Sequence, residues 1–62
     1  MTKESRLQEY WIQIFICLKV VQNCSDKVAK DYMHLYKDDI EKFYDDGFLP
    51  NQVAYGMTMG FI

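Results

Sequence analysis

The sequence contains few of the residues that staple or interrupt a small domain. There are one proline, three glycines, one histidine and two cysteines in 62 residues. Cys17 and Cys24 are seven positions apart, which on a continuous helix is roughly 10 Å, beyond the roughly 7 Å Cα separation that a disulfide spans. We therefore expect both thiols to be reduced. No zinc-binding spacing joins them to His34, so neither a metal ion nor another cofactor is expected.

Excess positive charge and long apolar runs are also absent. With a net charge of −2 the chain lacks the excess of Lys and Arg that displaces counterions from phosphates, so no nucleic acid partner is expected. The apolar run near residues 10–21 contains Gln13 and Lys19 and is only about twelve residues long, whereas a membrane-spanning helix needs about twenty. No secretory leader pattern is apparent, and we expect a cytoplasmic protein without a membrane partner.

Sixty-two residues predict a single small domain, residues 1–62. A chain of this size buries only about 60% of its unfolded surface, so its stability is expected to be marginal. Domains this small usually gain stability from a staple or from a partner chain.

In the stretch "YWIQIFICLKVV", residues 10–21, the apolar residues recur both at helical spacing and at every second position, as in a strand. Ser5 and Gln8 form a capping-box pattern, and the polar residues that follow favour a helix over residues 6–22. Its expected core face consists of Leu7, Trp11, Ile14, Leu18 and Val21. A strand interpretation remains open, because apolar residues also recur at every second position and many of them favour strands.

As a helix, this segment is apolar on two sides. Ile12, Ile16 and Val20 recur at every fourth position opposite the expected core face. Fully burying three such side chains would contribute on the order of 5–8 kcal/mol, which is comparable to the whole stability of a small domain. We therefore expect an association surface. The candidate interface residues are Ile12, Ile16, Val20, Met57, Met59 and Phe61.

A second helix is predicted over residues 26–46, capped by Ser25 and closed by Gly47. Its core face is expected to include Val28, Tyr32, Leu35, Tyr36 and Phe43. The opposite side carries a candidate acidic docking strip for a basic partner, made of Asp31, His34, Asp38, Glu41 and Asp45. The alternative is a charged face that is only solvated.

A third helix is predicted over residues 50–59, because Pro50 suits the first turn of a helix. The predicted fold class is all-α: a long helical hairpin plus a short C-terminal helix, completed by dimerisation. The alternative is an α+β arrangement of strand, helix and strand, in which "VAYGMTMGFI" forms the second strand and a partner is still required.

These features predict a small non-catalytic protein–protein interaction module that pairs with itself as a homodimer. The alternative is a monomeric regulatory inhibitor or adaptor, of the kind that phages and plasmids encode, that blocks a larger protein through its apolar strip or its acidic face. No catalytic residues are expected, since no paired nucleophile and base is visible.

Overall fold

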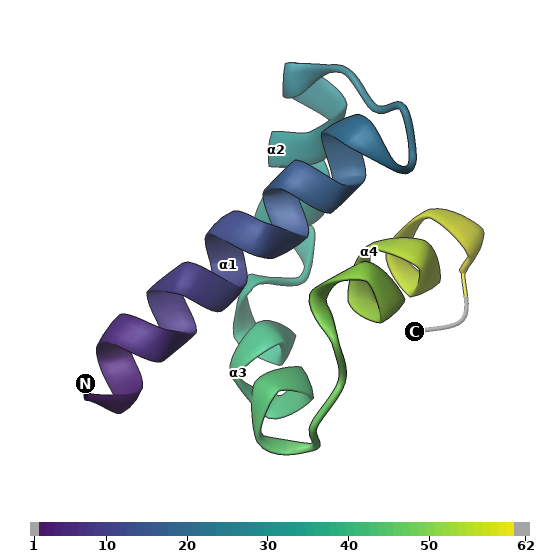
Figure 1. The fold of residues 1–62 in the computed structure, drawn as a ribbon. Helices are drawn as coiled ribbons and strands as arrows, with labels where there is room; N and C mark the ends of the chain where they lie inside the picture. The colour runs from purple at the N-terminus through teal and green to yellow at the C-terminus, as the bar shows by residue number, and fades with distance from the viewer. Residues whose placement is uncertain (1, 61–62) are drawn as a thin grey trace.

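The computed structural model describes residues 2–60, which form four α-helices (Figure 1). They are α1 (Lys3–Val20), α2 (Asp26–Leu35), α3 (Lys37–Asp45) and α4 (Pro50–Met59). No strand occurs between residues 2 and 60, so the all-α prediction is confirmed and the strand, helix, strand alternative is wrong.

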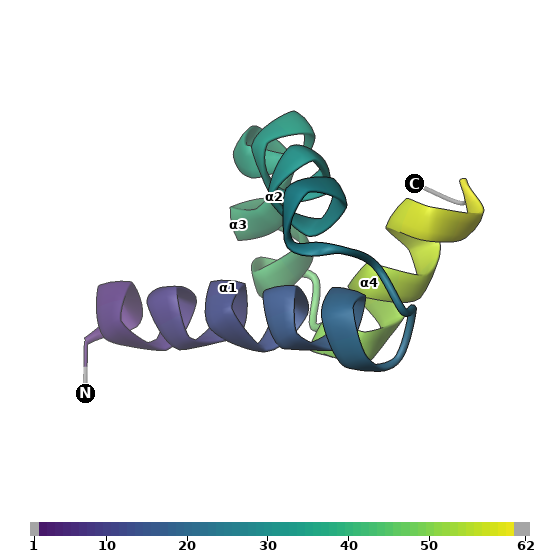
Figure 2. The same cartoon turned by 90° about the horizontal axis from the view of Figure 1, so that it is seen from above.

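The helices enclose one apolar core. Figure 2 shows α2 and α3 on one side of α1, and α4 beside the C-terminal part of α1. The most extensive helix–helix contact is between α1 and α4. The buried apolar residues come from all four helices and are Tyr10, Ile14, Leu18, Ala29, Met33, Ile40, Phe43, Val53, Ala54 and Met57.

Side-chain caps set the starts of the first two helices. The Ser25 hydroxyl accepts a hydrogen bond from the Val28 N–H at 3.3 Å, as predicted. At α1 the predicted capping box is wrong, because the Thr2 hydroxyl accepts from the Ser5 N–H at 3.2 Å and the helix begins at Lys3. Threonine is also a good N-cap residue, and starting there adds most of a turn to α1.

The long second helix predicted over residues 26–46 is interrupted. It ends at Leu35 and α3 starts at Lys37, with Tyr36 between them at φ −102° and ψ 12°. The interruption lets Ile40 and Phe43 turn toward the core, where both are buried. The predicted arrangement, a long helical hairpin plus a short C-terminal helix, is therefore corrected to four helices within residues 2–60.

Three residues of the expected core lie at the surface instead. Val28 on α2 is 42% exposed, and Leu35 at the end of α2 is 71% exposed. Val21 is 63% exposed because α1 ends one residue before it. Each lies at or near a helix end, where the chain turns away from the core.

The connection from α3 to α4 follows the predicted signals. Gly47 has φ +85°, the left-handed conformation that glycine adopts without strain, and Pro50 occupies the first turn of α4. The Leu49 N–H donates to the Gln52 side-chain oxygen at 2.9 Å. The Tyr10 hydroxyl donates to the Phe48 carbonyl oxygen at 2.7 Å, which ties this connection to α1.

Candidate protein interaction surface

The outer strip of α1, made of Ile12, Ile16 and Val20, is exposed to solvent. Their exposed fractions are 51%, 44% and 73%. On the opposite side of the same helix, Ile14 and Leu18 are completely buried. A side chain at every fourth position of a helix falls on one face, so these three form a continuous apolar strip.

A shallow apolar groove runs along α1 beside the outer strip. It consists of two adjoining hollows of about 300 Å³ and about 410 Å³, which share Trp11 and Ile12. We call this the Trp11 groove; its lining residues are Glu4, Leu7, Gln8, Trp11, Ile12, Phe15, Lys30 and Met33. The sequence pattern placed Trp11 in the core; its half-buried side chain packs against the core and also forms part of this surface.

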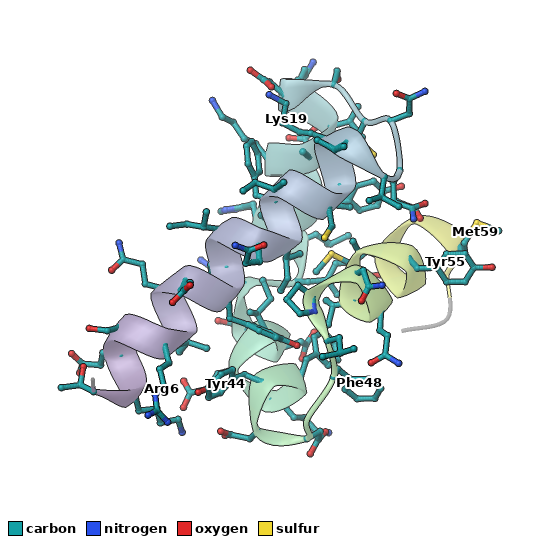
Figure 3. The ribbon with its side chains drawn as sticks, viewed as in Figure 1. Arg6, Lys19, Tyr44, Phe48, Tyr55 and Met59 are labelled. Carbon is teal, nitrogen blue, oxygen red and sulfur yellow. The ribbon has the colours of Figure 1, made fainter. Side chains whose placement is uncertain are left out.

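Charged groups lie at the two ends of the groove. Glu4 lines one hollow, and Lys30 of α2 lines the other. Near the Lys30 end lies Lys19, in the last turn of α1 (Figure 3). Its ammonium is 5.7 Å from the centroid of the Phe15 ring, within the range of a cation–π contact. Lys19 also forms an ion pair with Asp26, and its hydrogen bond lowers the pKa of that carboxyl.

The other predicted interface residues do not join the strip. Met57 is 3% exposed and belongs to the core, so it offers no surface to a partner. Met59 is 55% exposed but lies at the end of α4 (Figure 3), and Phe61 lies outside the described residues. Phe48 and Leu49, which the sequence pattern did not single out, are 47% and 59% exposed in the connection before α4.

The predicted acidic docking strip is divided by the break at Tyr36. All five members are exposed, with Asp31 and His34 on α2 and the remaining three on α3. Two of those are engaged within the chain: the Lys3 ammonium lies 3.4 Å from Glu41 Oε1 and 3.2 Å from Asp45 Oδ1. The hydrogen bond and charge of Asp45, followed by those of Glu41, raise the pKa of Lys3. The strip is therefore not one continuous helix face.

A more polar hollow of about 350 Å³ lies where α1 meets α3 and α4. It is lined by Arg6, Glu9, Tyr10, Gln13, Tyr44 and Pro50. The rings of Tyr10 and Tyr44 pack edge to face with their centroids 5.2 Å apart, and burial raises the pKa of Tyr10 to about 12. Because its hydroxyl is hydrogen-bonded to the Phe48 carbonyl oxygen, Tyr10 links α1 to the connection between α3 and α4.

Further features of residues 2–60 are the possible metal ligands, the cysteines and the apolar character of the helices. No three His, Cys, Asp or Glu side chains in this range are grouped so that they could hold a metal ion. Cys17 and Cys24 are both free and half-buried. None of the described helices combines the length and apolar character that crossing a bilayer requires.

Comparison with models of known protein families found no match, and neither the curated proteins nor the solved structures contain a match to this chain. Inferences about function therefore rest on the surface features of the molecule itself.

Proposed function

We propose that this protein is a small non-catalytic interaction module that pairs with a second copy of itself through the outer strip of α1. The exposure of Ile12, Ile16 and Val20 is the observation that carries the proposal. Apolar side chains that recur along one helix face gain free energy when another apolar surface covers them.

A stable interface needs more area than the outer strip of α1 supplies. A standard interface takes about 800 Å² from each partner, which is roughly a fifth of the 4404 Å² accessible surface of this chain. Three aliphatic side chains do not supply that area alone. The adjoining Trp11 groove adds the half-buried rings of Trp11 and Phe15, and aromatic residues are enriched at the energetic centres of interfaces.

A second copy is the simplest partner because a two-fold axis lets one patch cover the same patch on its twin. The four helices already use the inner face of α1 for their own core. A copy supplies what the short chain lacks, a matching apolar surface for the outer face.

The test is the mass in solution, measured by light scattering behind a sizing column over a dilution series, with circular dichroism on the same samples. Ile16→Lys places a charge in the centre of the outer strip and is expected to yield monomers. Leu35→Lys is the matched control, since Leu35 is exposed but lines neither the strip nor the groove. It should remain dimeric.

A well-folded wild-type monomer at every concentration would overturn the homodimer proposal. The second candidate, an inhibitor or adaptor that binds a larger protein, would then take its place. The exposed Leu35, Phe48 and Leu49 favour it as the second candidate, because they provide apolar surface outside α1.

A further inference from the structure

We draw no further inference here: the strongest candidate, the Trp11 groove beside the outer strip of α1, belongs to the surface already proposed for self-association, and nothing in the described residues shows which part of a second copy covers it.

Discussion

The two sides of α1 contain the same kind of side chain in opposite surroundings. Ile14 and Ile16 are two positions apart, yet Ile14 is completely buried and Ile16 is 44% exposed. The difference lies in what the rest of the chain can reach, since α2, α3 and α4 together cover only one side of the helix. A short chain cannot cover every apolar face that its sequence creates.

Replacing Ile14 and Ile16 by alanine, one at a time, should give the largest difference in the free energy of unfolding between the two sides of α1. Ile14→Ala is expected to lower the free energy of unfolding by about 2–5 kcal/mol, because it removes buried methyl groups and leaves a cavity. Ile16→Ala should cost well under about 1 kcal/mol at concentrations where the chain is monomeric. Urea unfolding followed by circular dichroism measures both.

If Ile14→Ala does not fold, Ile14→Val provides a milder comparison, with an expected cost of about 0.5–1.5 kcal/mol. Equal costs at the two positions in the monomer would contradict the burial described for the two faces.

Tyr10 lies on the buried side of α1, and its contribution to the free energy of unfolding should be smaller than that of Ile14 and larger than that of the exposed residues. Because burial raises its pKa to about 12, above the ordinary value of 10.0, the folded state retains the phenolic proton between those pH values while the unfolded state loses it. Stability should therefore decline as the pH rises from about 10 to about 12. Urea midpoints measured across this range report the change.

The control for this experiment is Tyr10→Phe, which should lack the Tyr10 contribution to the alkaline decline. At neutral pH the same variant should lose about 0.5–1.5 kcal/mol, since the hydrogen bond to the Phe48 carbonyl is absent. An identical alkaline profile in both proteins would show that the phenol of Tyr10 is not protected by burial.

The smallest effect is expected at the polar edge of the exposed side. Lys19 lowers the pKa of Asp26 below its ordinary value of 3.8 by hydrogen bonding and by charge. The stabilisation from this pair is present above the unfolded pKa and is lost as the pH falls through the folded value. Asp26→Asn should barely change the urea midpoint at neutral pH and should flatten the acid side of the profile slightly, because the pair is exposed.

Local sequence signals predicted three of the element ends correctly, whereas the capping box at Ser5 and Gln8 was wrong because Thr2 caps α1. Ser25, Gly47 and Pro50 act through their own backbone or side-chain chemistry, and each occupies the predicted position. The break at Tyr36 has no such signal, because no glycine or proline lies near it. It depends on how Ile40 and Phe43 reach the core, which is a tertiary effect.

The candidate surface likewise has one part that local sequence spacing predicts and another part that depends on tertiary packing. Helical spacing alone places Ile12, Ile16 and Val20 on one face of α1, so the outer strip can be found in the sequence. The Trp11 groove cannot, since Lys30 and Met33 reach it only after α2 has folded back along α1. Burial of Met57 likewise depends on where α4 packs.

The dominance of the α1–α4 contact also has a consequence for the order in which the chain folds on the ribosome. Val53, Ala54 and Met57 complete the core around Ile14 and Leu18, but they are synthesised after α2 and α3. Until α4 packs, the part of the inner face of α1 that it covers is exposed along with the outer strip. A partly folded chain in which α4 has not yet packed therefore exposes more apolar surface than the folded protein, which makes such a species prone to aggregate.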